Sequence, residues 1–308
     1  MPAELHDDDL TDVVRQSLRQ ALVQSEDDLW VVLATFGWPE LAETDEAFAF
    51  SVLFEELGTL PFGSDALDVV SAASVGLPGP ASIIWPAGFG GSGVTPSRTD
   101  LTTEGVALRS LRGTGRTLLV PLGDRLLVLE ADEIEEERLV GMARDSGWRR
   151  VRAHGARGDD VGSWSAVARR ARLALASELV AVAQHILDVA TDQVSTRRQF
   201  GRPIGANQSV RFRLAEGFAE VAGARALVAA AWEDGSPDAS VWAKAVAGAT
   251  HDSVAKQALQ VCGAIGLSDE HALPGLVRRG FSLDALLVST MEPDVGFAAP
   301  APEPVGWY

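Results

Sequence analysis

The chain has 308 residues, of which 46% are hydrophobic and 22% charged, so it can bury a substantial core and is not a disordered tail. Its 43 acidic and 26 basic side chains give a formal net charge of −17, which argues against nucleic acid as the main partner. Cys262 is the only cysteine, which excludes an internal disulfide framework and a cysteine cluster for zinc or iron–sulfur. An acidic start and the lack of an apolar run of about 18 residues predict a soluble, cytoplasmic protein without a membrane partner.

Residues 1–75 predict an N-terminal helical domain. Leu10, Val14 and Leu18 fall on one face of a helix, and glycine and proline residues divide the segment into about three short helices. Pro39 is expected near a helix start and Gly58 near a helix end.

Residues 76–160 change to short apolar stretches separated by turn residues, which predicts a small middle β domain. Strands are expected at 81–85, 105–108, 117–120 and 125–129, and residues 121–124 form a hairpin connection between the last two. The acidic run from Glu130 to Glu137 favours a solvated loop or helix face over a metal site.

Residues 161–292 predict four long helices, at about 163–195, 208–232, 241–262 and 272–287. In the first, Leu175, Leu179, Val182, Ile186 and Val189 step by four and three residues and form one apolar stripe. Short connections make an antiparallel four-helix bundle the natural packing. Residues 293–308 hold four prolines and predict an extended tail, so the fold class is mainly α with a small β domain.

Several motifs fail to support a site. Gly88 to Gly93 match G-x-G-x-x-G, but the residues that follow do not open a helix, so a flexible turn is favoured over a dinucleotide site. No two histidines are spaced i,i+4, and neither H-E-x-x-H nor G-x-S-x-G occurs, so no metal site is predicted. Glu270 and His271 are adjacent on a helix and do not face each other.

Two blocks are more informative. The first runs from Ser195 to Gln208 and holds three arginines beside a Phe-Gly and a Pro-Ile turn, which suits a diphosphate because guanidinium groups pair with phosphate oxygens. Taken alone, it fits an interhelix loop with solvated arginines better. The second runs from Gln260 to His271, where glycines at a helix end permit close backbone approach or form a simple C-cap and loop.

Together, the two blocks resemble the C-terminal domain of the acyl-CoA dehydrogenase family. That family has an R-x-Q-F-G-x-P-I loop and a Q-V-x-G-G-x-G-[FY]-[TS]-x-E-H stretch at the spacing found here. Looser matches occur at 36–41, 55–58 and 243–245, and the resemblance is strongest over about 165–280. It implies a helical N-terminal domain, a β middle domain, a C-terminal four-helix bundle and tightly bound FAD.

The resemblance also implies roles for individual residues. Arg197 would reach the FAD pyrophosphate, Phe200 and Gly201 would line the cofactor, and Asn207 and Gln208 would approach its adenosine half. Residues of the second block would meet FAD across a subunit interface, because family members share each cofactor between two chains. These residues are Gln260, Val261, Cys262, Gly263 and Ala264.

The sequence departs from the family at the catalytic base. The family removes an α-proton from an acyl-CoA with a glutamate, whose two known places fall at about Val288–Thr290 and at Ala171, and neither holds a carboxylate. Glu178 is the remaining candidate, its alternative role being a helix carboxylate that meets a partner chain. Glu292 lies near the first place but follows the wrong residues, and the W-[IV]-[TS] and P-E-x-x-G-G patterns are not evident.

Shortened acyl-CoA dehydrogenases of bacterial steroid side-chain degradation are similar in these respects, being α2β2 heterotetramers of two unlike chains. The resemblance therefore predicts a subunit that shares FAD, lacks the base and acts on a sterol-derived or bulky acyl-CoA. Its electrons would pass to an electron-transfer flavoprotein or a similar acceptor. Two alternatives stay open, namely a flavin-free scaffold, favoured by Ala264 in place of the usual second glycine, and a self-sufficient enzyme that uses Glu178.

Overall fold

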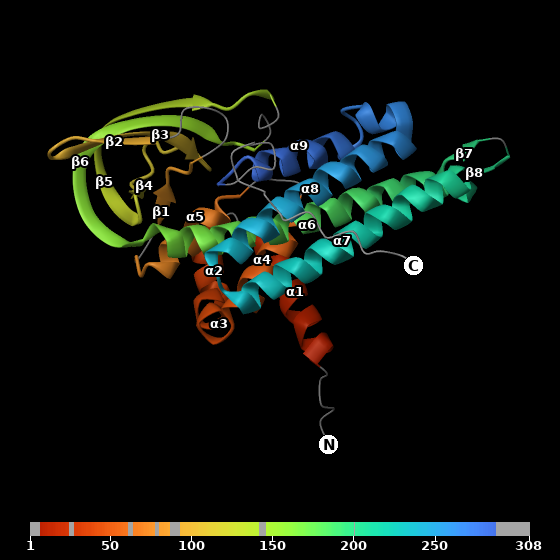
Figure 1. Ribbon diagram of the computed structural model, residues 1–308, viewed down its shortest axis with the longest axis horizontal. Helices are drawn as coiled ribbons and strands as arrows, with labels where there is room; N and C mark the ends of the chain where they lie inside the picture. The colour runs from red at the N-terminus through yellow and green to blue at the C-terminus, as the bar shows by residue number, and fades with distance from the viewer. Residues whose placement is uncertain are drawn as a thin grey trace, which may run out of the picture.

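The computed structural model describes residues 7–24, 28–60, 64–77, 80–86, 93–141, 146–199 and 201–287. It has a β part at one end and a long helical bundle that extends away from it, with shorter helices packed alongside (Figure 1). Of the glycine-rich stretch only Gly93, the first residue of a strand, is described. Outside the described residues lie Gly88 to Ser92, Phe200, Val288–Thr290, Glu292 and the proline-rich tail. The fold class predicted from the sequence, mainly α with a small β domain, is confirmed. The domain limits stay a prediction.

The N-terminal part holds five helices within the described residues, more than the three predicted. They are α1 (Asp7–Gln24), α2 (Leu29–Phe36), α3 (Trp38–Thr44), α4 (Glu46–Thr59) and α5 (Ala66–Ser74). Gly37 separates α2 from α3 by adopting a left-handed φ of 84°, and the Asp45 carboxylate caps α4 by accepting the backbone N–H of Phe48 at 2.9 Å. Pro39 lies in the first turn of α3 and Gly58 in the last turn of α4, as predicted.

The β part is one six-stranded sheet in the order β1-β4-β5-β6-β3-β2, in which only the β1–β4 pair is parallel. The strands are β1 (Ala81–Ile83), β2 (Gly93–Pro96), β3 (Asp100–Ala107), β4 (Thr117–Leu122), β5 (Arg125–Arg138) and β6 (Arg149–Ser163). Just beyond β1, Trp85 exchanges two backbone hydrogen bonds with Val106 of β3, which closes the sheet on itself. The long, curved β5–β6 pair forms the outer wall (Figure 1).

The prediction for the acidic run was wrong, because Glu130 to Glu137 belongs to β5 rather than to a loop or helix. Arginines of β6 stand opposite its glutamates, so that Glu135 pairs in register with Arg152 and Glu137 with Arg150. Opposite charges across neighbouring strands stabilise a sheet. Strand β6 was not predicted at all, because its exposed arginines, glycines and aspartates hide the alternation of apolar residues.

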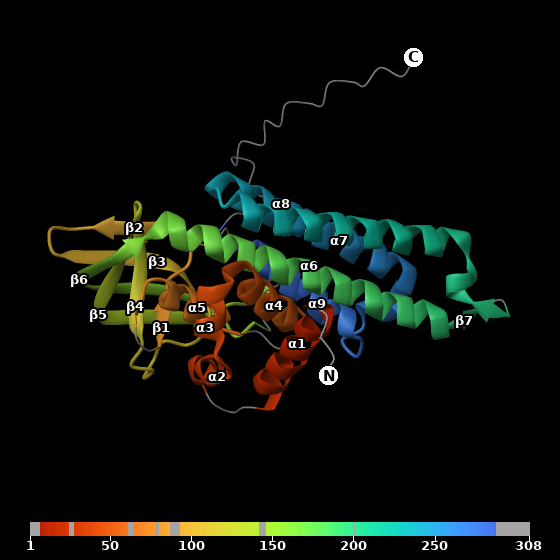
Figure 2. The ribbon, with the colours of Figure 1, turned by 90° about the horizontal axis from the view of Figure 1, so that it is seen from below.

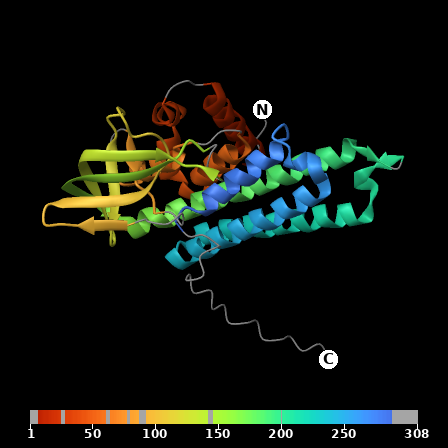
Figure 3. The same cartoon turned by 90° about the horizontal axis from the view of Figure 1, so that it is seen from above.

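The C-terminal part is formed by α6 (Trp164–Thr196), α7 (Gln208–Asp234), α8 (Pro237–Cys262) and α9 (Ala272–Asp284), close to the predicted ranges. A small hairpin of β7 (Arg198–Gln199) and β8 (Arg202–Pro203) and a short helix η2 (Ile204–Ala206) connect α6 to α7, and η3 (Gly263–Leu267) follows α8. Helices α7 and α8 lie on one side of α6 and the N-terminal helices on the other (Figure 2). Helix α9 runs back beside α8 toward the β part (Figure 3).

Helix α6 is the core of the molecule. By length and composition it could cross a membrane, but its apolar window is 78% buried inside the protein, as in a core helix. Gly58 lets α4 approach it closely: a Cβ at this position would lie 2.5 Å from the Cβ of Ala181 and 2.9 Å from the carbonyl oxygen of Glu178. Such contacts hold the N-terminal helices against the bundle.

Candidate functional site

The two informative sequence blocks meet at the end of the bundle that lies farthest from the β part (Figure 1). Arg197 ends α6, and its Nη1 donates a hydrogen bond to the carbonyl oxygen of Cys262 at 3.2 Å. The hairpin after it turns at Gly201, which has a left-handed φ of 80°, and returns when Ile204 N–H donates to the Arg197 carbonyl at 2.9 Å. Segments 65 residues apart therefore form one surface.

Several predicted cofactor residues on this surface are exposed. They are Gly201, Gln208, Gln260, Gly263 and Ala264. A Cβ at Gly201 or Gly263 would meet nothing within 4 Å. This surface thus presents to solvent the backbone of the two glycines and the side-chain amides of the two glutamines.

The rest of this surface is partly buried or apolar. Val261 and Asn207 are half-buried, and Asn207 Oδ1 accepts a hydrogen bond from Arg202 at 2.6 Å. Ile265 and Leu267 add exposed apolar area beside the glycines.

Cys262 is buried beneath this surface and does not face outward with its neighbours. Burial raises the pKa of its thiol, while the nearby Arg197 guanidinium acts in the opposite direction. The residue therefore packs as a small apolar side chain. Its backbone carbonyl is the group that holds Arg197 in place.

The other end of α6 lies at the β part, and Ala171, one of the two base positions of the family, falls in the half of α6 nearer to it. Ala171 is fully buried and offers no carboxylate. Leu287 directly precedes Val288–Thr290 and is the only non-glycine residue with a positive φ, 64°, in the described ranges. Its backbone N–H donates to the carbonyl of Pro86 at 3.2 Å, which ties the end of the bundle to the strand β1 side of the sheet. A leucine in this conformation is strained, as residues at functional sites often are.

Glu178 is occupied by an ion pair inside this chain. Its Oε1 accepts two hydrogen bonds from Arg279 of α9, from Nη2 at 2.6 Å and from Nε at 3.2 Å. Arg279 also donates to the carbonyl oxygens of Leu57 and Leu60 at the end of α4. The pair joins α4, α6 and α9, and its hydrogen bonds occupy Oε1.

A cavity of about 290 Å³ lies beside this pair, between α4 and α5 on one side and α6 and α9 on the other. Phe54, Leu175 and Leu283 are among its apolar wall residues, and Leu108 and Trp148 close it on the side of the β part. Its size is at the lower end of the range for small-molecule sites.

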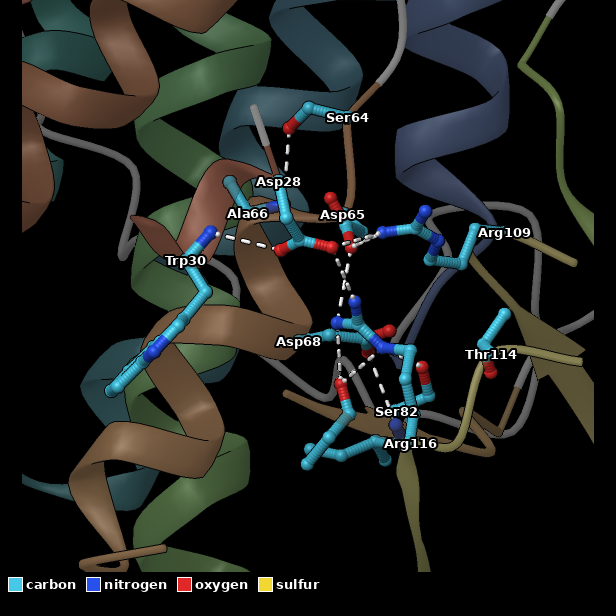
Figure 4. A network of polar contacts seen from close by, with 12 residues as sticks. Asp28, Trp30, Ser64, Asp65, Ala66, Asp68, Ser82, Arg109, Thr114 and Arg116 are labelled. Atoms are coloured by element: carbon cyan, nitrogen blue, oxygen red, sulfur yellow. Dashed lines mark hydrogen bonds and ion pairs between the residues drawn. The ribbon is translucent and has the colours of Figure 1, made fainter. Parts of the chain in front are cut away.

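A network of charges, buried at Arg116 and open to solvent at Asp28, joins the N-terminal helices to the sheet (Figure 4). Arg116, just before β4, is 2% exposed and lies 3.1 Å from Asp65 and 3.3 Å from Asp28. Arg109, after β3, bonds to the same two carboxylates. These residues come from separate segments, and no motif in the sequence connects them.

Asp68 of α5 lies at the centre of this junction (Figure 4). Its Oδ1 accepts hydrogen bonds from the Trp85 indole at 2.7 Å and from Ile83 N–H at 3.2 Å, whereas its buried Oδ2 has no partner within the described ranges. Burial raises the pKa of Asp68 to about 7, and the Trp85 hydrogen bond opposes the rise. The charge state of Asp68 thus affects how Trp85 is held.

The segment 243–245 of α8, one of the looser matches to the family, is also buried. Lys244 is 0% exposed and lies 3.1 Å from the Asp284 carboxylate of α9. His251 lies farther along the interface between α8 and α9, and its ring packs edge-on against Phe281. Burial lowers the pKa of His251 to about 4. A Cβ on Gly280 would fall 2.0 Å from His251 Nε2, so this glycine is what allows the ring to fit. These contacts hold α9 on α8.

Comparison with known proteins agrees with this geometry. Residues 165–282 match the family model described as acyl-CoA dehydrogenase, C-terminal domain. Helices α6 to α9 are thus similar to the C-terminal domain of acyl-CoA dehydrogenases. Acyl-CoA dehydrogenase IpdE2 of Mycobacterium tuberculosis is 31% identical over 126 residues, which are 41% of this chain and 40% of that protein. The chain thus matches well under half the length of this curated relative.

Another curated relative and two solved structures are also similar to this chain. The 3-sulfinopropanoyl-CoA desulfinase of Paraburkholderia xenovorans is 34% identical over 111 residues, or 35% of this chain and 29% of that protein. Among solved structures, the steroid acyl-CoA dehydrogenase Tcur3481-Tcur3483 has a TM-score of 0.68 at 23% identity and covers 92% of this chain and 95% of its own. The ChsE4-ChsE5 complex from Mycobacterium tuberculosis has a TM-score of 0.65 at 19% identity, over 89% and 91%. These structures establish the fold.

Within the described ranges, no group of three or more His, Cys, Asp or Glu residues is placed to hold a metal ion.

Proposed function

We propose that this chain is one subunit of a heteromeric FAD-dependent acyl-CoA dehydrogenase in which a partner subunit supplies the proton-abstracting glutamate. The observation that carries the proposal is the separation of two half-sites along α6. Arg197 lies 26 residues beyond Ala171 on this helix, a distance of about 39 Å. No single FAD molecule spans both, so a cofactor held at the Arg197 end would meet the β part of another chain.

The residues at the Arg197 end fit one part of FAD. Arg197 keeps further N–H donors beyond the one directed at Cys262, and guanidinium donors suit a pyrophosphate. Exposed Gln208 and Gln260 could pair with polar atoms of the adenosine half, with Asn207 beside them. The open faces of Gly201 and Gly263 permit the backbone to approach a flat ligand. Val261 and Ala264 flank that approach, and Phe200 is assigned here on the sequence motif alone.

Bound FAD would accept hydride from the β-carbon of the acyl group. The residues of this chain would hold the cofactor, order its surface and exclude water. The α-proton must go to a base that this chain does not supply, since neither Ala171 nor Val288–Thr290 holds a carboxylate and Glu178 is engaged by Arg279. This supports a glutamate from the partner over a self-sufficient enzyme that uses Glu178.

The substrate class and partners follow from the relatives. Two similar structures are named as a steroid acyl-CoA dehydrogenase and as a ChsE4-ChsE5 complex, which supports a bulky, sterol-derived acyl-CoA and a second acyl-CoA dehydrogenase-like subunit in an α2β2 assembly. An electron-transfer flavoprotein or a similar cytoplasmic acceptor would take the electrons. A flavin-free scaffold is the second candidate, and Ala264 in the place of a family glycine is the observation that favours it.

The test needs a candidate partner, to be sought among the neighbouring genes as a second short acyl-CoA dehydrogenase-like chain. This chain alone, the candidate alone and the two co-expressed are then purified. We expect acyl-CoA oxidation only from the assembled pair. Full turnover by this chain alone would contradict the proposal. A pair that assembles but contains no flavin would favour the scaffold.

A further inference from the structure

Helix α7 turns an exposed, apolar face away from the bundle. Its buried residues recur every three or four positions, from Leu214 to Ala231, and they face α6 and α8. The opposite side of the helix is exposed from Phe212 to Ala230, over about 27 Å. Between these ends small residues form the face, namely Ala215, Ala219, Ala222, Gly223, Ala226 and Ala230.

Large apolar side chains border this α7 face. Phe212 is 63% exposed at its beginning, and Phe218 is 39% exposed along one edge. The charged residues Glu216 and Arg225 lie toward its two edges and leave the middle uncharged. Depletion of charge beside exposed aromatic rings is typical of the centre of a protein–protein interface.

The charge of the chain restricts which partner can approach this way. Two copies of a chain with a net charge of −17 repel each other on average, so they can meet only through a surface that lacks acidic side chains or pairs them. The α7 face meets this condition. Its charges are segregated to the two ends of the helix, with Arg211 before Phe212 and Asp234 at the last position.

An antiparallel pair of α7 helices makes the face complementary to itself. Successive residues are about 100° apart around a helix, which puts the centre of the face between Ala222 and Gly223. A two-fold axis at this point sets residues equally far before and after it opposite each other. Ala219 then faces Ala226 of the other copy, and two small residues allow the helices to approach closely.

The same axis pairs the charged ends. Arg211 and Asp234 are equally far from the centre, on opposite edges of the face, so each Arg211 stands opposite the Asp234 of the other copy. The two ion pairs are equivalent by symmetry. A parallel arrangement would instead bring like charges together at both ends, which disfavours it.

We propose that α7 binds α7 of a second copy of this chain, antiparallel and around a two-fold axis, and that this contact joins two heterodimers into the α2β2 assembly. The unlike subunits of that assembly rest on the proposed function. The face begins about one helical turn after Gln208, so the contact is adjacent to the proposed FAD surface and separate from it.

Oxidative cross-linking in the co-expressed pair tests which chains meet and in which direction. With Ala219→Cys and Ala226→Cys in one chain, each new thiol faces its counterpart, and we expect a disulfide-linked dimer of twice 32.6 kDa. Either substitution alone should give no dimer, because equivalent residues of antiparallel copies are about 10 Å apart along the helix, beyond the reach of a disulfide. The native Cys262 is buried. No link in the double variant, or equal links in the single ones, would overturn the proposal.

Analytical ultracentrifugation of the same pair measures the contact without cross-linking. Ala226→Glu puts a carboxylate from each copy into the face, so the α2β2 assembly should dissociate into heterodimers at least about tenfold more readily. Val13→Glu is the matched control, since Val13 is 54% exposed on α1, across α6 from α7 (Figure 2). An Ala226→Glu pair with the mass and affinity of the wild type would contradict the proposal.

A charge exchange tests the register. Arg211→Asp should weaken the association of heterodimers by about tenfold, through two lost ion pairs, and adding Asp234→Arg should restore it. Failure to restore it would refute the antiparallel pairing. Flavin content separates the two proposals: Ala226→Glu heterodimers that keep their flavin support a contact separate from the cofactor, flavin without the cross-link refutes this inference alone, and a cross-linked pair without flavin refutes the proposed function alone.

Discussion

Replacing Asp68 by Asn should remove a large pH dependence from the stability of this protein. The ordinary pKa of an aspartate is 3.8, and burial raises that of Asp68 to about 7. Folding then requires the carboxyl to keep its proton at pH values where the unfolded chain has lost it. Below the pKa of the unfolded chain, the ionisation of Asp68 has no effect on the free energy of unfolding. As pH rises, it lowers that free energy, by about 4 kcal/mol above pH 7. Asn cannot ionise, and its Oδ1 can still accept from Trp85 and Ile83.

Urea unfolding followed by tryptophan fluorescence at pH 5 and pH 8 measures this effect. Between these values the free energy of unfolding of the wild type should fall by about 3 kcal/mol relative to Asp68→Asn. His251 is present in both proteins, so its own titration cancels in the difference. Asp132→Asn, on the exposed surface of β5, is the matched control and should run parallel to the wild type.

A constant difference between wild type and Asp68→Asn at both pH values would refute the reasoning. It would mean that Asp68 has an ordinary pKa in the folded protein and that its role is limited to its hydrogen bonds. A difference that grows in favour of the wild type at pH 8 would reverse the sign and would require Arg116 to stabilise the charged form.

Three further substitutions test the packing described above. Gly58→Ala should destabilise the protein by about 1–3 kcal/mol in thermal unfolding because its Cβ meets Ala181, whereas Gly223→Ala, in open space on α7, should be neutral or slightly stabilising. Gly280→Ala should be more harmful, since its Cβ would overlap the His251 ring, and adding His251→Ala should recover part of the loss; additive losses would contradict the contact. Glu178→Gln should lower the free energy of unfolding by about 3 kcal/mol, because it leaves the Arg279 charge without its partner, while the two assembled subunits keep their turnover. Loss of turnover in a protein that still folds would instead make Glu178 the base.

The helical bundle could be predicted closely because its signals are local. The apolar stripe of α6 and the glycine and proline breaks fix helix ranges within a few residues. Strand β6 and the acidic half of β5 could not be predicted in the same way. Their exposed residues pair by charge with a neighbouring strand, and that pairing has no local signature in the sequence.

The candidate site, too, could be predicted only where its signals are local in the sequence. The two cofactor blocks are contiguous motifs, and the structure brings them together through the hydrogen bond between Arg197 and Cys262; their contact with a cofactor stays a prediction. The partner of Glu178 was not predicted, because Arg279 lies 101 residues away and the sequence offered only an unspecified partner chain. The Asp68 junction is similarly formed by short segments whose proximity exists only after folding.

The central claim is that this chain holds one part of an FAD shared with a second subunit. The most direct measurement is the visible absorption spectrum of the co-expressed pair, with flavin counted per subunit. The account predicts one FAD for every two chains, loss of that flavin on Arg197→Ala, and retention on Arg198→Ala, the neighbouring exposed arginine. An intact pair that contains no flavin, or one that keeps its flavin after Arg197→Ala, would contradict it.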